Sequence, residues 1–486
     1  MKNTLVLVIA AALVCAVVGL LCLAGCTDNS TPSAITDKFA NLADDGEFVK
    51  NKGAKGESAE YVFNKEITFN ALVLKESGDE IRKFRVYADD ASEPFYGSDF
   101  VEGYHYGSFP AVTASKVRVE VQDCTGSWKL KELEAYNITG TAQDFEIMGY
   151  VTTQWAYGGG ELDERWAPNL ADATQLNYIS GAYFDSKGEL YFRAQDGSDM
   201  VYKTGDSSAQ GLAARETFEK GLQNLREYTD AEIVVTFLGN INGGTGEELT
   251  TEERHNAAMT GAAAQTLTAN ILDFMEEFDF DGVSFDYEYP SARRSFENFT
   301  AYLNALHSAM DERFGEGNKL LTAAISEWQL GTASFNPEEL AVLDKIEVMA
   351  YDLFDDHGNH SSFYSSCFTI INQIKEKGFD LSKINLGLPF YSRPESGDTF
   401  WGNYFDVAEE LGRWDNSRYY DSYVNLDGVA GSGNTWFNGR GMVYDKTCYA
   451  IDCGVGGVMI WHIGTDSTVE GYRLMDVIVD AVRSRS

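Results

Sequence analysis

Hydrophobic positions follow two different spacings along the chain, and the change comes near residue 145. Beyond that point, short apolar runs alternate with longer segments of helical period, the patterns of buried strands and amphipathic helices. The predicted strands span residues 147–152, 178–184, 233–238, 282–287, 321–325, 346–351, 384–389 and 457–461. The predicted helices span residues 213–228, 255–278, 295–314, 337–343, 363–377, 444–453 and 469–483. This alternation predicts an α/β fold, a (β/α)8 TIM barrel over 145–486. An open doubly wound sheet is the alternative, although no glycine-rich phosphate loop follows a strand.

Residues 35–141 show the other spacing, in which apolar and polar residues alternate over short segments separated by Gly, Asp and Ser. The segments are 59–62, 67–75, 81–87, 116–121 and 129–136. They predict an antiparallel β-sandwich of roughly a hundred residues. Its aromatic residues Tyr96, Tyr104, Tyr106 and Trp128 are candidates for stacking on a sugar face, with core packing or a spacer role as the alternative.

The N-terminus carries the features of an export signal. Lys2 precedes an apolar run over residues 5–25, which ends in Leu-Ala-Gly before Cys26 and resembles a bacterial lipobox. We therefore expect residues 1–25 to be a lipoprotein signal peptide, Cys26 to be lipidated, and residues 26–34 to be a tether. An uncleaved membrane anchor is the alternative, because about twenty apolar residues can span a bilayer. Both interpretations predict an exported protein, at the cell surface or in the periplasm, held at a membrane.

Composition narrows the choice of partners. The 486 residues allow two or three domains, and 38 Lys and Arg against 75 Asp and Glu give a formal net charge of −37. Nucleic acid and anionic membrane surfaces would repel such a chain, whereas a neutral polysaccharide would not. The six histidines form no ligand pair, so we expect neither a metal nor a cofactor. The thiols after Cys26 match no metal motif, and we expect them to be free and buried, with a Cys448–Cys453 disulfide as the alternative.

The most informative segment is the predicted strand around residues 281–290, Asp-Gly-Val-Ser-Phe-Asp-Tyr-Glu-Tyr-Pro. Alternate residues of a strand face the same way, so Ser284, Asp286 and Glu288 are predicted to share one face. The two carboxyl groups would lie within about 7 Å of each other, and the pKa of one should rise because both cannot ionise freely. A carboxyl with a raised pKa can act as an acid near neutral pH.

Further polar and aromatic residues stand at the predicted carboxyl ends of other strands, where a barrel carries its chemistry. They are Tyr150, Trp155, Trp328, Tyr351, Asp352, Tyr391, Arg393 and Trp461. Paired carboxyls among several aromatic rings are typical of a carbohydrate site, where rings stack on sugar faces and an acid protonates the glycosidic oxygen.

Four of these segments together resemble the chitinase-like glycoside hydrolases of family 18. The run at 281–290 matches the family's Asp-Gly-x-Asp-x-Asp-x-Glu signature except at Ser284. Met-Ala-Tyr-Asp at 349–352, Leu-Pro-Phe-Tyr-Ser-Arg at 388–393 and Gly-Gly-Val-Met-Ile-Trp at 456–461 resemble the motifs of the sixth, seventh and eighth strands. Residues 35–138 more loosely resemble a discoidin, or coagulation-factor type C, domain, which in bacterial enzymes often binds carbohydrate.

The resemblance implies a retaining endo-glycosidase that hydrolyses β-1,4-linked N-acetylglucosamine in chitin-type polymers or glycans, with the substrate's acetamido carbonyl as nucleophile. Glu288 would protonate the leaving oxygen, Asp286 would hold the acetamido N–H, and Tyr351 would hydrogen-bond the carbonyl oxygen. The implied substrate-binding residues are Asp352, Trp461, Tyr391, Arg393, Tyr150, Trp155 and Trp328. A monomer and a partner containing N-acetylglucosamine are expected.

Two departures from the family pattern leave other interpretations open. Ser284 replaces an inner aspartate that shares a proton with the Asp286 position, which predicts an altered pH profile. Thr-Phe-Leu-Gly-Asn at 236–240 stands where a Ser-x-Gly-Gly turn is usual, and the short 393–435 segment favours a shallow, endo-acting groove. A non-catalytic surface lectin and a peptidoglycan hydrolase of the same family are the alternative functions.

Overall fold

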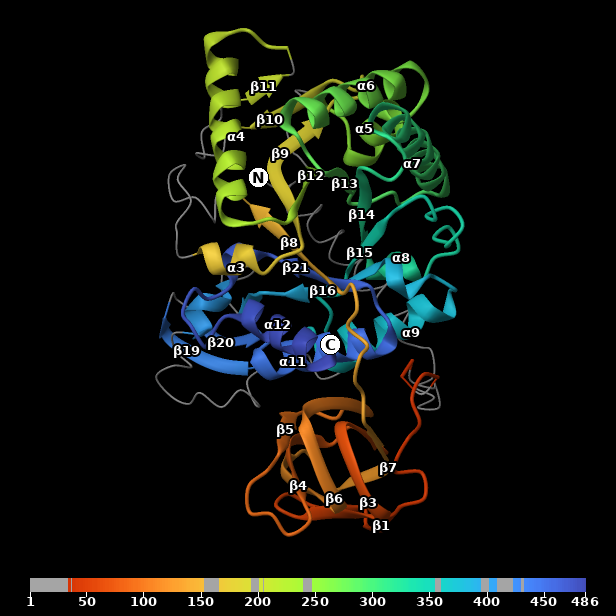
Figure 1. Cartoon of the computed structure of the whole chain (residues 1–486), viewed down its shortest axis with the longest axis vertical. Helices are drawn as coiled ribbons and strands as arrows, with labels where there is room; N and C mark the ends of the chain where they lie inside the picture. Colours follow the sequence, from red (N-terminus) through yellow and green to blue (C-terminus); the bar gives the residue numbers. More distant parts are fainter. Residues whose placement is uncertain are drawn as a thin grey trace, which may run out of the picture.

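The computed structural model describes residues 34–35, 37–152, 166–193, 201–203, 205–238, 247–354, 360–394, 402–408, 423–429 and 432–486. The expected signal peptide, Cys26 and Trp155 lie outside these residues. Among the helices of the described part, none is long and apolar enough to cross a membrane. Figure 1 shows an antiparallel β-domain beside a larger part built of strands and surrounding helices.

The β-domain contains seven antiparallel strands around its own apolar core, which includes Phe69, Phe84 and Trp128. They are β1 (Glu47–Lys50), β2 (Lys52–Gly53), β3 (Ser58–Glu76), β4 (Ile81–Ala88), β5 (Tyr96–Asp99), β6 (Tyr104–Cys124) and β7 (Trp128–Tyr136). Their order is β2-β7-β3-β6-β4-β5, with β1 paired to β3. This arrangement fits the predicted sandwich. The segments 59–62 and 67–75 form one long strand, β3, because a register shift against β6 carries the chain across the polar residues between them.

Eight parallel strands close into a barrel, which confirms the predicted TIM-barrel fold. They are β8 (Glu146–Thr152), β9 (Gln175–Phe184), β12 (Glu232–Leu238), β13 (Gly282–Asp286), β14 (Leu320–Ser326), β15 (Lys345–Met349), β16 (Ile384–Pro389) and β21 (Gly457–Trp461). Each pairs with the next, and β21 pairs with β8 to close the ring. All eight correspond to predicted strands.

Further strands extend this ring. The strands β10 (Leu190–Arg193) and β11 (Val201–Lys203) continue from β9 in antiparallel pairing. Between β16 and β21, a separate sheet has the order β18-β17-β20-β19, formed by β17 (Tyr391–Pro394), β18 (Gly402–Asn403), β19 (Tyr423–Val429) and β20 (Ser432–Phe437). The sequence pattern did not predict these short strands.

Helices surround the barrel (Figure 1). They are α3 (Ala167–Ala171), α4 (Ala209–Tyr228), α5 (Thr251–Ala258), α6 (Gly261–Phe278), α7 (Arg293–Phe314), α8 (Glu327–Leu330), α9 (Thr369–Glu376), α11 (Arg440–Cys453) and α12 (Leu474–Arg485). A π-helical turn, η2 (Tyr364–Phe368), precedes α9. A 3-10 turn, η3 (Leu381–Lys383), precedes β16, and another, η4 (Ile463–Thr465), follows β21.

Three helix predictions need correction. The expected helix at 255–278 is divided into α5 and α6, because Gly261 adopts a φ of +60°. The helix expected at 469–483 begins only at Leu474, after Gly471 with a φ of +83°. Residues 337–343 form turns instead of a helix.

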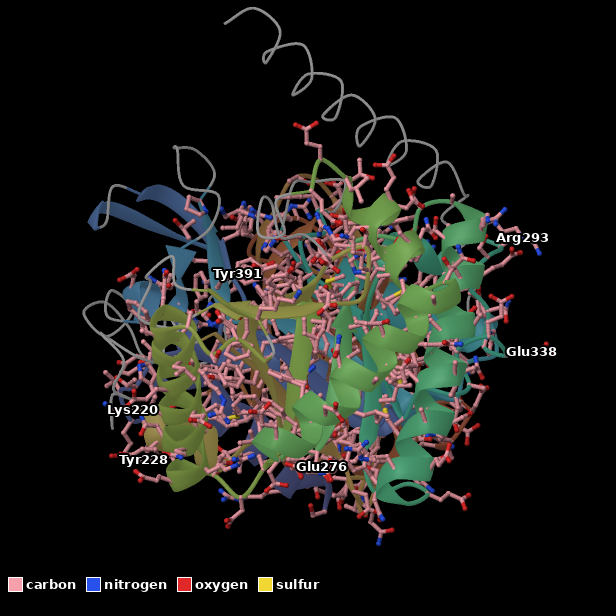
Figure 2. All side chains as sticks on the ribbon, turned by 90° about the horizontal axis from the view of Figure 1, so that it is seen from above. Lys220, Tyr228, Glu276, Arg293, Glu338 and Tyr391 are labelled. Atoms are coloured by element: carbon pink, nitrogen blue, oxygen red, sulfur yellow. The ribbon has the colours of Figure 1, made fainter. Side chains whose placement is uncertain are left out.

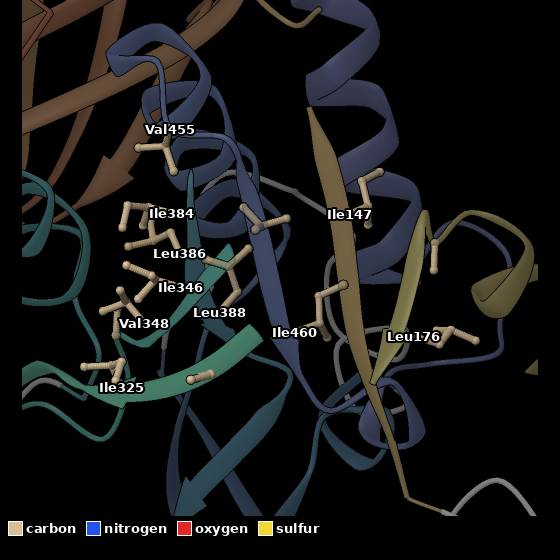
Figure 3. Close-up of a cluster of buried hydrophobic side chains, with 14 of the residues drawn as sticks. Ile147, Leu176, Ile325, Ile346, Val348, Ile384, Leu386, Leu388, Val455 and Ile460 are labelled. Atoms are coloured by element: carbon tan, nitrogen blue, oxygen red, sulfur yellow. The ribbon is translucent and has the colours of Figure 1, made fainter. Parts of the chain in front are cut away.

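Side chains alternate between the outside and the inside of the barrel along every strand. Outward apolar residues belong to one buried hydrophobic cluster, part of which Figure 3 shows with Ile147, Leu176, Ile325, Ile346, Val348, Ile384, Leu386, Leu388 and Ile460. Their inward neighbours include a fully buried polar set, Gln175, Asn177, Thr236, Ser284, Thr322, Glu347 and Asn385. Above it lies a small apolar cluster of Met148, Tyr150, Ile179 and Met459. The barrel interior is therefore a packed layer with a polar middle.

The β-domain docks on the barrel through the residues expected to bind sugar, which corrects that expectation. The ring of Tyr104 stacks on that of Phe368 in η2, with 3.9 Å between the ring centroids. The hydroxyl of Tyr96 donates to Asp445 at 2.5 Å. Tyr106 donates to Asp452, and Trp128 is buried within the β-domain. None of these four rings is available to a ligand, because packing between and within the domains covers them.

The described cysteines are free thiols, so Cys448 and Cys453 do not form the alternative disulfide. Both lie in α11, where residues five positions apart face different directions.

A buried ion pair at this interface yields a stability prediction. Asp452 accepts from Arg485 Nε at 2.8 Å and from the Tyr106 hydroxyl, and both charged side chains are almost fully buried. We expect Asp452→Ala to lower the free energy of unfolding by about 3–5 kcal/mol, because Arg485 would keep a buried charge without its carboxylate. Urea denaturation measures this change. In the control, Glu297→Ala removes an exposed pair with Arg293 and should leave stability unchanged. Equal losses in the two variants would contradict the prediction.

Candidate active site

Asp286 and Glu288 lie at the carboxyl end of β13. Asp286 is the last residue of the strand and is buried, whereas Glu288 follows just beyond it and is half-buried. Burial, the charges of Glu288 and Glu347, and a hydrogen bond with Glu288 raise the pKa of Asp286 well above its usual range. Its Oδ1 atom has no hydrogen-bond partner among the described residues. Burial therefore favours the protonated form of Asp286, and Glu288 is the more exposed of the two carboxyls.

Beneath this pair, Glu347 points into the barrel from β15 and is fully buried. Its carboxylate accepts from Thr322 Oγ1 at 2.6 Å, Asn177 Nδ2 at 2.8 Å and the Tyr150 hydroxyl at 2.5 Å. The hydroxyl of Ser284 lies 3.2 Å from one Glu347 oxygen and 3.4 Å from the other. Sequence reasoning missed Glu347, although a lone acid between the apolar residues of 346–348 signals an inward position.

Tyr351 and Trp461 stand on the same side of the ring, just beyond β15 and at the end of β21. Tyr351 is half-buried, with its hydroxyl 3.8 Å from Met459 Sδ. Trp461 makes an edge contact with Tyr150, with 5.2 Å between the ring centroids. Burial, followed by the neighbouring charges, raises the pKa of Tyr351 well above its usual range. The Tyr351 hydroxyl is therefore a hydrogen-bond donor throughout the neutral range.

Asp352 gathers a second polar cluster beside Tyr351. One oxygen, Oδ1, accepts from the Tyr391 hydroxyl at 2.7 Å and from Arg393 and lies 3.0 Å from His360 Nε2. The Asp352 side chain is 41% exposed, and its φ of +59° is a costly conformation for a residue other than glycine. Figure 2 places Tyr391 inside the outline of the molecule in this view, whereas Lys220, Arg293 and Glu338 lie at its edge.

The remaining predicted residues are placed differently. Trp328, in α8, is 36% exposed and makes an edge contact with Tyr289, the residue after Glu288. Trp155 lies outside the described residues, as do Gly239 and Asn240 of the unusual third-strand turn. The structure thus brings Glu288, Asp286, Tyr351, Asp352, Tyr391, Arg393, Trp461 and Tyr150 to one end of the barrel.

Comparisons with known proteins give the fold and family. Residues 146–466 match the family model described as glycosyl hydrolases family 18. Endochitinase 1 of Metarhizium anisopliae is 25% identical over 246 residues, which are 43% of this chain and 57% of that protein. The chain therefore spans little more than half of this curated relative.

Two crystal structures share the fold. A chitinase from Bacteroides thetaiotaomicron is 20% identical, with a TM-score of 0.52 over 70% of this chain and 97% of that one. A class V chitinase from Nicotiana tobaccum in complex with NAG4 is 17% identical, with a TM-score of 0.51 over 70% of this chain and 99% of that one. At these identities the structures support the fold alone.

The Asp352 cluster gives a pH-dependent stability prediction. Burial opposes the shift, but hydrogen bonds from His360 and Tyr391 and the charge of Arg393 lower the pKa of Asp352 overall. A lowered folded-state pKa adds stability above the ordinary value of about 3.9, and this stability is lost as the pH falls through the folded value. We expect Asp352→Asn to be less stable than the wild type at pH 7, with a difference that shrinks below about pH 4. Denaturation across that range measures it, and a constant difference would refute the assignment.

Proposed function

The chain belongs to glycoside hydrolase family 18, and from this premise we propose that it is a retaining endo-glycosidase acting on β-1,4-linked N-acetylglucosamine, in chitin-type polymers or in glycans. The observation that carries the proposal is the pair of Asp286 and Glu288, one carboxyl buried and the other half-buried, beside the hydroxyl-bearing ring of Tyr351. The similarity to named chitinases supports the class of substrate.

The burial of Asp286 supports a substrate-assisted route. Burial and the neighbouring carboxyls raise the pKa of Asp286, which favours its protonated form and makes it a poor nucleophile. The second carboxylate of an ordinary retaining glycosidase is therefore missing, and the acetamido carbonyl of the substrate can take its place. Held in line with the anomeric carbon, this intramolecular group supplies an effective molarity of roughly 10⁵ M or more.

The two chemical steps then follow from the residues present. In the first step, the proton held between Asp286 and Glu288 passes to Glu288, which gives it to the departing glycosidic oxygen as the glycosidic bond breaks and the acetamido oxygen bonds to the anomeric carbon. Asp286 accepts the acetamido N–H, and Tyr351 donates to the acetamido oxygen, so the oxazolinium ion forms between two fixed partners. In the second step, Glu288 takes a proton from water, which bonds to the anomeric carbon and reopens the ring with the configuration retained.

Aromatic and charged residues around the pair support sugar binding. Trp461 offers a half-buried ring as a floor for the reacting sugar, backed by Tyr150. Asp352, fixed by Arg393 and Tyr391, would contact the distorted sugar, and Trp328 would widen the surface toward the rim.

The central test is a substitution of the acid. We expect Glu288→Gln to lower kcat by about 10²–10⁴-fold, because it removes general acid and base catalysis without changing shape. The assay follows new reducing ends from chito-oligosaccharides, N-glycans and peptidoglycan. The matched control is Glu146→Gln, at the opposite end of the barrel in contact with Asn385 and Lys345, which should keep the activity.

The same assay separates the alternatives. The substrate with the highest kcat/KM identifies a chitinase, an endo-β-N-acetylglucosaminidase or a peptidoglycan hydrolase. A wild type as inert as Glu288→Gln on all three substrates, but with sugar binding by calorimetry, would replace the proposal with a surface lectin.

We also propose that the protein is an exported lipoprotein, anchored to a membrane through Cys26 as the Leu-Ala-Gly-Cys run suggests. In a bacterial host, the wild type should partition into the membrane fraction and Cys26→Ala should not. The control Cys124→Ser changes a thiol in the β-domain and should stay with the membrane. Equal partitioning of Cys26→Ala and wild type would refute the lipid anchor.

A further inference from the structure

Glu347 is a buried carboxylate that the proposed reaction does not use directly. Four hydrogen-bond donors from four other strands converge on it: Tyr150 of β8, Asn177 of β9, Ser284 of β13 and Thr322 of β14. Taking a carboxylate out of water costs several kcal/mol, so a barrel that needed only packing would place an apolar residue there. The site is built for a negative charge.

The hydrogen bonds show which carboxyl carries the charge. Both Glu347 oxygens accept, Oε1 from Thr322 and Asn177 and Oε2 from Tyr150, which leaves little room for a proton on Glu347 itself. Burial raises the pKa of Glu347, and these hydrogen bonds oppose that rise. Asp286 Oδ1 has no hydrogen-bond partner among the described residues, whereas both Glu347 oxygens accept, so we assign the proton to Asp286 and the charge to Glu347.

Ser284 allows the Glu347 carboxylate to occupy this position. Its hydroxyl stands within 3.2 Å of Glu347, so an aspartate at position 284 would bring a second carboxylate to the same place. Two carboxylates at that distance cannot both ionise, whereas a serine can donate. The layer beneath Asp286 therefore holds a single acid, and that acid comes from β15 instead of β13.

We propose that Glu347 is a positioning residue for the reaction, whose buried negative charge keeps one proton on the Asp286–Glu288 pair until the glycosidic oxygen takes it. The inference rests on the proposed function. The other titratable groups facing the pair are Tyr150 on β8, Tyr289 after Glu288, and Tyr351 and Asp352 after β15. The pKa values of the three tyrosines are raised, and Asp352 is paired with Arg393. We therefore expect loss of the proton from the carboxyl pair to set the pH at which activity falls on the alkaline side.

The test compares two double variants that differ by one charge. Ser284→Asp with Glu347→Gln moves the acid to β13, and Ser284→Asn with Glu347→Gln has the same shape without the charge. We measure kcat/KM against pH on labelled chitotetraose. Without the charge, the carboxyl pair loses its proton at lower pH. The fall in kcat/KM at alkaline pH should therefore begin about one pH unit or more lower in the double variant with Ser284→Asn, the Asn double. In the double variant with Ser284→Asp, the Asp double, this alkaline limb should stay at the wild-type pH.

Single variants and melting temperatures separate charge from structure. Glu347→Gln alone should shift the limb like the Asn double. Glu76→Gln, which removes a fully buried carboxyl of the β-domain, should leave the limb in place whatever it does to Tm. Because the comparison is between the two double variants, the test does not require the Glu347→Gln single variant to fold.

The outcomes distinguish the two proposals. Coincident alkaline limbs in the two doubles, with an active wild type, would overturn the role of Glu347 and leave the proposed function standing. A wild type inert on chitotetraose, N-glycans and peptidoglycan would overturn the proposed function and this inference with it.

Discussion

A carboxylate in the middle of the barrel constrains the rest of the active site. Glu347 is removed from solvent, and the cost of its charge is offset only if its donors stay in place. Hydrogen bonds to a charged group contribute about 1.5–3 kcal/mol each, so the donors together match a desolvation cost of several kcal/mol. Because the donors belong to β8, β9, β13 and β14, this interaction links five of the eight barrel strands, β15 included.

The same interaction connects the fold to the chemistry. Ser284 and Asp286 are alternate inward residues of β13, so the strand that donates to Glu347 also carries the buried acid. Glu288 lies just beyond the strand, where it is half-buried and open to a substrate. The charge of Glu347 lies deepest in the barrel, the protonated Asp286 lies above it, and the accessible Glu288 lies nearest the solvent. This order suits an acid that works near neutral pH. Tyr351, after β15, and Trp461, at the end of β21, complete the arrangement from two other strands of the ring.

The periodicity of the sequence was enough to predict the eight barrel strands and most of the helices, because apolar residues mark both the outward faces and the helix stripes. It failed where glycine conformation decided a helix boundary, as at Gly261 and Gly471. It also failed for the aromatic rings of the β-domain, since alternation shows that Tyr104 and Tyr106 share a face of a strand but not that α11 and η2 cover this face. Glu347 was missed for a related reason: its donors are distant in sequence, and only closure of the ring brings them together. Ser284 could be recognised as a departure from the motif, but its partner could not.

In the proposed arrangement, the proton rests on Asp286 while Glu347 remains charged. A neutron crystal structure of the deuterium-exchanged protein at neutral pH tests it most directly, because it locates the exchangeable hydrogens themselves. We expect a deuteron on Asp286 shared toward Glu288, no deuteron on Glu347, and the hydroxyl deuterons of Tyr150 and Thr322 directed at Glu347. A deuteron on Glu347, with Asp286 bare, would contradict it.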